Sequence, residues 1–431
     1  MRIMRNKFIR TIAISVSMYS THAVSGDLGI DLFSETEYSS NITRSRVGGL
    51  SDVEQRSGLI VNYLEESRSV QADANFRLET LNYLENTYED EVSLTTGFGV
   101  VNFNLVEDLL SWQTSYDREE LLVGVGAEDT PDNREYRGVL RTGPVVDYRF
   151  SPSSSVSLNS RYVKAQNTGD FLSDSERFES DLSYIYQWNS ITELIVISGY
   201  EDLFEIESES TYKRYSMDVG ASRLVSNGLI SLTVGRTYLE PKFGDSLSEN
   251  HIDLEFRRDR FLLHDLTLRY SQNLFDNSVG SPVTDASESV TAEALEDSTS
   301  VREEFYVVVE RDLGGARYTI SPYWFSEKYA NALIDEDNFG ASFRYDFEVN
   351  TFLQTGFMAS YDQTDYGNGL ANSRFGVDET YTFEVSAIYS VSATLTLNTT
   401  LQYENQTNKY VLDREYDEIS AGLGLNWQLF E

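Results

Sequence analysis

Hydrophobic and polar side chains alternate one by one along most of the chain, from about Leu28 to about Phe430. In residues 381–390, aromatic and aliphatic side chains occupy the odd positions from Tyr381 to Tyr389, and mainly polar side chains occupy the even positions. A period of two places the two sets on opposite faces of a β-strand. Because no sustained helical period competes with this alternation, the sequence predicts an all-β protein.

The predicted strands are joined by connections that alternate between short and long. Short reversals are expected near residues 66–69, 103–109, 150–154, 188–191, 225–228, 259–264, 312–315, 348–350 and 390–392. Longer, acidic connections are expected at 39–55, 85–90, 118–137, 165–176, 204–211, 240–250, 276–300, 326–336, 364–377 and 405–415. A Greek-key sandwich would need crossing connections. We therefore predict a transmembrane up-and-down antiparallel β-barrel of about 18–20 strands, with short periplasmic turns and long acidic external loops.

Aromatic residues recur at two levels along the predicted strands. Phe150, Trp188, Phe347 and Tyr389 lie beside the short turns, and Tyr162, Tyr200, Tyr361 and Tyr403 lie further along the same or the next strand. A tilted strand needs about 9–11 residues to cross a membrane. Two aromatic levels that bracket an aliphatic band indicate two membrane interfaces, since amphipathic rings favour the headgroup region.

The first 25 residues differ from the rest of the chain. Arg2, Arg5, Lys7 and Arg10 precede the apolar run "TIAISVSM", and small residues stand at Ala23 and Ser25. We interpret residues 1–25 as a signal peptide and residues 26–431 as the barrel, rather than residues 1–25 as a retained amphipathic helix. This assignment predicts export to the outer membrane of a Gram-negative bacterium.

Composition excludes several classes of function. The chain has no Cys, so it offers neither disulfides nor a thiolate metal site. A formal charge of −36 repels nucleic acid phosphates, which argues against a nucleic acid partner. No calcium-loop motif occurs, and we expect no cofactor and no bound metal.

Four phrases carry a resemblance to a known family: "SETEYSSNITRS", "RSGLIVNYLEESRSVQADANFRLETLNYLENT", "FNLVEDLLSWQTSYDREEL" and "GPVVDYRFSPSSSVSLNSRY". Together they resemble the outer-membrane β-barrel family associated with PEP-CTERM and exopolysaccharide gene clusters. The resemblance implies an envelope barrel linked to polysaccharide export or sorting, with exopolysaccharide and export components as partners, and it implies no catalytic residues. The last segment, "EISAGLGLNWQLFE", resembles the C-terminal strand signal that the barrel-insertion machinery reads.

An enzyme would need a nucleophile and a base. Beyond residue 25 only two histidines occur, His251 and His264, and they are expected at opposite ends of one strand. No G-x-S-x-G or H-E-x-x-H motif is present. A set of His251, Asp253 and an unidentified Ser is the remaining alternative, and we predict no enzymatic activity.

The polar face of the strands predicts a water-filled lumen. The candidate lumen-lining residues are Arg149, Arg161, Glu255, Arg257, Arg269, Arg317 and Arg344. Arg257 and Arg269 are expected to face each other across one hairpin, near Glu255. One hypothesis is a constriction that contacts an anionic sugar polymer. The alternative is a wall held together by arginine–carboxylate ladders.

The longest connection, 276–300, is acidic and contains no Lys or Arg. Its candidate gating residues are Asp285, Glu288, Glu293, Glu296 and Asp297. A loop of this length is usually functional or disordered, so we hold open an inward-folded constriction loop and an external flap. Acidic loops could also bind outer-membrane lipopolysaccharide through divalent cations, or could simply be solvated.

These features together predict a hydrophilic passage across the outer membrane that is associated with exopolysaccharide export or envelope biogenesis. The alternatives are a structural or surface-display barrel without a transport role, and a general porin. With 16–18 strands a barrel already encloses an aqueous channel, so about 18–20 strands are enough for a passage.

Overall fold

The computed structural model describes residues 26–122, 130–169, 174–205, 211–242, 246–276, 299–329, 335–367, 376–411 and 414–430. The predicted signal peptide, residues 1–25, lies outside these ranges. Within them, no α-helix is long and apolar enough to span a membrane.

The fold is a single antiparallel sheet of 20 strands. One 3-10 turn, η1 (Pro131–Asn133), precedes the sixth strand. The strands are β1 (Asp27–Ser39), β2 (Asp52–Glu66), β3 (Val70–Tyr83), β4 (Glu91–Val106), β5 (Leu110–Leu122), β6 (Arg134–Ser151), β7 (Ser154–Asn167), β8 (Ser175–Asn189), β9 (Thr192–Glu205), β10 (Tyr212–Val225), β11 (Gly228–Pro241), β12 (Leu247–Phe261), β13 (His264–Asp276), β14 (Thr299–Asp312), β15 (Ala316–Tyr329), β16 (Glu336–Asn350), β17 (Leu353–Asp365), β18 (Val377–Ser390), β19 (Leu395–Asn408) and β20 (Tyr416–Phe430).

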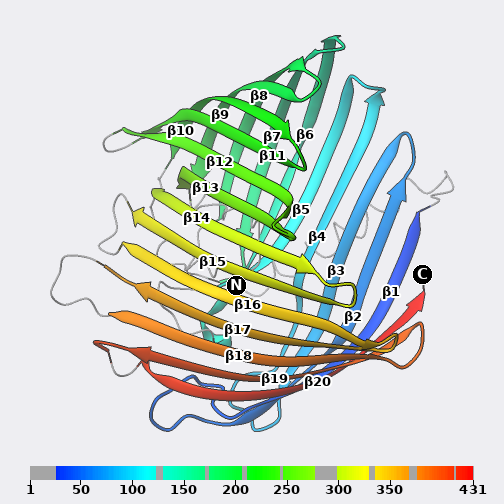
Figure 1. Cartoon of the computed structure of the whole chain (residues 1–431), viewed down its shortest axis with the longest axis vertical. Helices are drawn as coiled ribbons and strands as arrows, with labels where there is room; N and C mark the ends of the chain where they lie inside the picture. The colour runs from blue at the N-terminus through cyan, green and yellow to red at the C-terminus, as the bar shows by residue number, and fades with distance from the viewer. Residues whose placement is uncertain are drawn as a thin grey trace, which may run out of the picture.

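Each strand pairs with its neighbours in the chain, and β20 pairs with β1 to close the sheet into a barrel (Figure 1). The closing register runs from Ile30 opposite Phe430 to Ser39 opposite Ser420. Short turns follow the even-numbered strands from β2 to β18, and longer connections follow the odd-numbered strands. We call the two ends of the barrel the turn end and the loop end. The predicted up-and-down barrel is confirmed, with the strand number at the upper limit of the predicted range.

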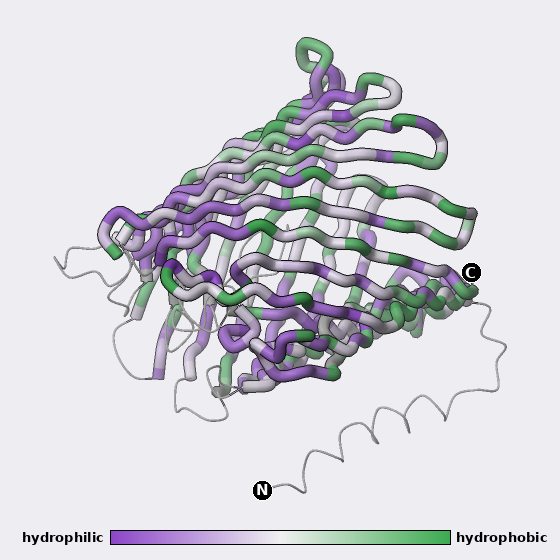
Figure 2. Tube along the Cα trace, turned by 90° about the horizontal axis from the view of Figure 1, so that it is seen from below, coloured by the Kyte–Doolittle hydropathy of each residue, from purple (hydrophilic) through white to green (hydrophobic). Residues whose placement is uncertain are grey.

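The outward face of the strands is apolar because alternate residues point away from the lumen. Tyr200, Tyr215 and Tyr238 lie opposite one another on β9, β10 and β11, and their ring centroids are 5.4 Å and 6.5 Å apart. Trp188 at the turn end is 67% exposed. Hydrophilic residues dominate at the loop end (Figure 2). The exposed aromatic residues therefore form the kind of belt that a membrane interface selects.

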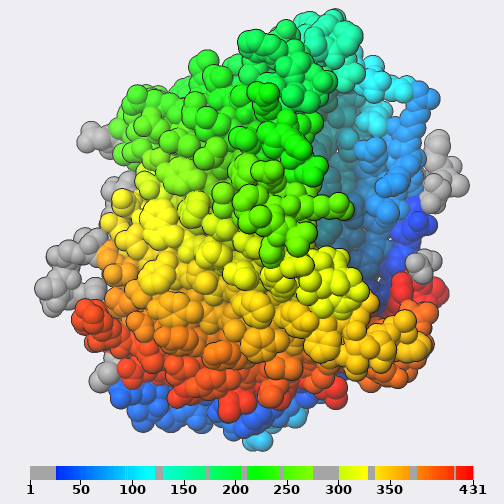
Figure 3. Space-filling model, viewed as in Figure 1, coloured from blue at the N-terminus to red at the C-terminus, as the bar shows by residue number. Residues whose placement is uncertain are grey.

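The inward face is polar, and its burial changes along the barrel axis. Near the loop end, inward side chains such as Arg137, Val163 and Ser300 are almost fully buried. Near the turn end, inward side chains such as Asn398 and Asn426 are exposed. The space-filling view is hollowed on the side of the short turns, between the N-terminal strands and the turns of the middle strands (Figure 3). The lumen is therefore open at the turn end, whereas inward side chains near the loop end are covered.

Candidate functional site: the barrel lumen

The strand register places all seven candidate lumen-lining residues on the inward face. They are distributed over six strands: Arg149 on β6, Arg161 on β7, Glu255 and Arg257 on β12, Arg269 on β13, Arg317 on β15 and Arg344 on β16. Glu255 lies opposite Arg269, whereas Arg257 lies opposite Thr267. The expected facing pair of Arg257 and Arg269 is therefore wrong by one inward position, because the two arginines lie diagonally across the hairpin.

Most of these arginines are held by carboxylates on the same wall. Arg269 donates to Asp253 at 3.0 Å, and Arg344 donates to Asp346 at 2.9 Å. Arg317 pairs with Glu310 at 2.5 Å. A guanidinium that is already paired offers less charge to a passing anion, so this wall corresponds to the ladder alternative rather than to a ring of free cations.

Further ion pairs join β5 to β6 and β7 to β8. Arg141 contacts Asp117 at 2.8 Å. Arg161 lies 3.2 Å from Glu179 and 3.4 Å from Asp181. Neighbouring strands bring these side chains together because directly opposed residues lie on the same face.

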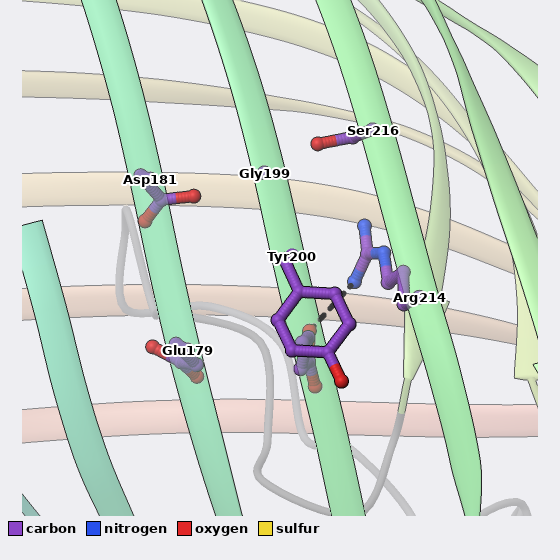
Figure 4. A pocket seen from close by; sticks show the side chains of 7 residues that line it. Glu179, Asp181, Gly199, Tyr200, Arg214 and Ser216 are labelled. Carbon is purple, nitrogen blue, oxygen red and sulfur yellow. Dashed lines mark ion pairs between the residues drawn. The ribbon is translucent and has the colours of Figure 1, made fainter. Parts of the chain in front are cut away.

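A recess of about 200 Å³ opens in this wall between β8, β9 and β10 (Figure 4). Carboxylates of Glu179, Asp181 and Glu201 line it together with Arg214 and Ser216. Gly199 makes the space, since a Cβ at this position would lie 2.5 Å from Ser216 Oγ. The dashed line in Figure 4 joins Arg214 Nη1 to Glu201 Oε2 over 3.8 Å. The recess offers hydrogen-bond acceptors and one guanidinium to a hydroxylated or cationic group.

His251 lies on the inward face of β12 and has a carboxylate partner that the sequence did not indicate. Its Nδ1 is 2.7 Å from Asp218 Oδ1 of β10, and the Asp218 residue is 6% exposed. Asp253, the expected partner, is bound by Arg269 instead. His264 contacts Tyr318 at the turn end. Within the described residues, no hydrogen bond joins His251 to a Ser or Thr hydroxyl, and no cluster of His, Asp and Glu could hold a metal ion.

Carboxylates form a second wall that our sequence analysis overlooked. Strands β17, β18, β19, β20 and β1, which are adjacent in the closed sheet, contain no Lys or Arg. We call their inward faces the arginine-free wall. Its acidic side chains on the inward face include Asp31, Glu35, Glu37, Asp362, Asp378, Glu384, Glu404 and Glu418. Amides and hydroxyls occupy most of its other positions. The alternation in these strands already assigns their acidic side chains to the polar face, so this wall could have been predicted from the sequence.

Two arginines from loops neutralise the arginine-free wall at the loop end. Arg414 Nε lies 3.1 Å from Asp378 Oδ2. Arg44 Nε lies 3.3 Å from Glu418, and Arg44 Nη2 lies 3.5 Å from Glu404. These two arginines tie the β19–β20 and β1–β2 connections to the inner wall. The sequence carried no signal for these contacts, because they join loops to strands that are distant along the chain.

Tyr366, which follows β17, completes this cluster. Arg414 stacks over its ring at 5.2 Å from the centroid, and the residue is 9% exposed. Burial, and then the nearby Asp378 carboxylate, raise the pKa of Tyr366 above its ordinary range. The hydroxyl therefore stays protonated at any pH of a cell envelope.

The predicted gating residues Asp285, Glu288, Glu293, Glu296 and Asp297 lie outside the described residues. The structure gives the strands on either side, β13 and β14, which pair up to Asp276 opposite Thr299. The hypothesis of an inward-folded acidic loop stays a prediction.

Comparisons with known proteins bear on the fold. No family model and no curated protein matches the chain. Among solved structures, the siderophore receptor PirA from Acinetobacter baumannii is similar over 95% of this chain and 81% of its own, with a TM-score of 0.55 and 8% identity. The FrpB iron transporter from Neisseria meningitidis (F5-1 variant, apoprotein form) is similar over 94% and 81%, with a TM-score of 0.53 and 8% identity. The outer membrane protein opdK from Pseudomonas aeruginosa matches over 93% and 99%, with a TM-score of 0.41 and 10% identity. The chain has the fold of outer-membrane β-barrels.

Proposed function

We propose that this protein is an outer-membrane barrel that forms a passage for hydrophilic solutes, with its turn end in the periplasm and its loop end outside the cell. The observation that carries the proposal is the polar inner wall, which continues from the loop end to an open turn end. A polar interior is filled with water, and its charged side chains determine which solutes enter.

The resemblance to the PEP-CTERM and exopolysaccharide-associated family suggests a polysaccharide as the solute. The lumen suits such a ligand chemically. The arginine-free wall presents amide and hydroxyl groups at its exposed positions, among them Asn398, Thr400 and Asn426. These groups both donate and accept hydrogen bonds, as sugar hydroxyls do. Lipid, lipopolysaccharide and the barrel-insertion machinery are the partners that follow from an outer-membrane site.

A second candidate function is a structural or surface-display barrel that conducts nothing. The buried cluster at the loop end favours it, because Arg414 and Asp378 are 12% and 7% exposed and hold one connection against the inner wall. A permanently closed loop end would block passage.

Single-channel recording in a planar bilayer separates the two functions. Purified protein should give discrete conductance steps in 1 M KCl if the lumen is a passage. Steps that never appear at any voltage, in protein whose barrel is shown to be folded, would favour the structural role. The solute is then sought by liposome swelling with neutral sugars of increasing size.

A further inference from the structure

We infer that the passage selects cationic over anionic solutes, and that the arginine-free wall contributes to this selectivity. This inference rests on the proposed function, because it names the solute class of the same lumen. It concerns the inner wall of β17, β18, β19, β20 and β1, and it depends on no residue of the connection 277–298.

The two signs of charge are distributed unequally inside the barrel. Arginines of the inner wall occur on strands from β2 to β16, and within the described residues most of them contact a carboxylate of the same or a neighbouring strand. The arginine-free wall has no such partners in its own strands. The lumen therefore has one wall in which arginines pair with part of the carboxylates, and another wall whose own strands carry carboxylates and no arginine.

The negative charge of the arginine-free wall is only partly compensated from outside it. Arg44 and Arg414 reach Glu404, Glu418 and Asp378 at the loop end. Arg77 of β3 lies 3.0 Å from Glu35. No described Lys or Arg forms an ion pair with Glu37 or Glu384. Carboxylates without a described Lys or Arg partner, such as Glu384, therefore lie between the loop-end cluster and the turn end.

Carboxylates along one side of a water-filled lumen attract cations and repel anions. The effect acts over about 10 Å at 0.1 M salt and about 3 Å at 1 M salt. A barrel of 20 strands is wide, so the selectivity should depend strongly on salt. A permeating polysaccharide should accordingly be neutral or amine-bearing, since a uronic acid polymer would meet the same repulsion as chloride.

The test is the reversal potential across a planar bilayer with a fourfold KCl gradient. We expect a several-fold preference for K⁺ over Cl⁻ near 0.1 M KCl, and a ratio close to that of bulk solution near 1 M KCl. Chitosan oligosaccharides should reduce the current at lower concentration than dextran or dextran sulfate of the same length.

Variants assign the effect to the wall. Glu384→Lys should lower the K⁺ preference at least twofold, and Thr400→Lys, at an exposed position of the same wall, should lower it without removing any native contact of a carboxylate. Asp202→Lys is the matched control. Asp202 lies on the outward face of β9, and its substitution changes the net charge by the same amount as Glu384→Lys. It should leave the ratio unchanged.

The outcomes separate this inference from the proposed function. Conductance steps with a Cl⁻ preference would overturn the inference but not the proposed passage. The same holds for a K⁺ preference that neither Glu384→Lys nor Thr400→Lys changes. A folded barrel that never conducts would overturn the passage, and the selectivity with it.

Discussion

Replacing Arg414 by Met should release the β19–β20 connection from the inner wall. Arg414 Nε lies 3.1 Å and 3.2 Å from the two oxygens of Asp378, and both side chains are largely buried. Methionine keeps much of the apolar volume beside Tyr366 but removes the cationic partner of the Asp378 carboxylate, which keeps the hydrogen bond from Asn408 Nδ2 at 2.6 Å. Removing one partner of a buried ion pair costs about 3–5 kcal/mol.

A cost of this size changes the balance between the attached and the released connection by a factor of about 100 or more, since 1.4 kcal/mol corresponds to a factor of ten. Limited trypsin digestion of the folded barrel measures the release. Lys409, at the start of this connection, is exposed, and cleavage after it should become at least tenfold faster in Arg414→Met. Single-channel conductance should rise as well, because the released connection no longer covers the inner wall.

Two further variants test the reasoning. Asp378→Asn combined with Arg414→Met should restore much of the protection, because the amide leaves no stranded charge. Arg317→Met is the control, because it removes an ion pair whose arginine side chain is 58% exposed. A surface pair contributes only about 0–1 kcal/mol, so the cleavage rate should stay close to that of wild type. Equal cleavage rates in wild type and Arg414→Met, or a double variant as sensitive as the single one, would refute the role of the buried pair.

Three other predictions follow from the fold. Unboiled protein should migrate differently from boiled protein on a denaturing gel, and identical migration together with solubility in detergent-free buffer would contradict a membrane barrel. Gly143→Ala should reduce the folded fraction on such a gel, because the new Cβ would overlap Ser160 O and lie 2.9 Å from Arg161 Cα. The expected loss of stability is about 1–3 kcal/mol. The control Gly367→Ala should fold normally, since its Cβ would have no neighbour closer than 3.8 Å. Leu262→Asn combined with Leu263→Gly should stabilise the barrel by about 1–3 kcal/mol in a urea titration. Both leucines have a positive φ (51° and 76°), which Asn and Gly adopt more readily. An unchanged or lower urea midpoint would show that the leucines make contacts that offset the backbone cost.

The architecture could be predicted from the sequence because a membrane barrel repeats one local rule. Each strand must place apolar residues toward lipid and polar residues toward water. The alternation, the turns and the aromatic levels therefore all depend on residues that are close together in the chain. All nine expected short reversals fall at the turns that join β2 to β3, β4 to β5 and so on to β18 and β19. The same local rule placed all seven candidate lumen-lining residues on the inward face.

Contacts between strands required the structure. Arg257 lies opposite Thr267, and Arg269 lies opposite Glu255, so the two arginines are diagonal rather than directly opposed. Asp218 is the partner of His251 although 33 positions separate them, and Arg44 reaches Glu418 across the closing seam between β1 and β20. Alternation determines which face a side chain occupies, and it carries no information on which neighbour that side chain will meet.

The sequence by itself thus determined the strand number within narrow limits, the two faces of every strand and the separation of short turns from long connections. Each of these depends on residues that are adjacent in the chain. Only the tertiary structure decided that inward side chains are covered near the loop end and exposed near the turn end, and that loop arginines compensate one end of the arginine-free wall. Closing the sheet brings β17 to β20 beside β1, and that closure places acidic positions that are far apart in the sequence on one side of the inner wall.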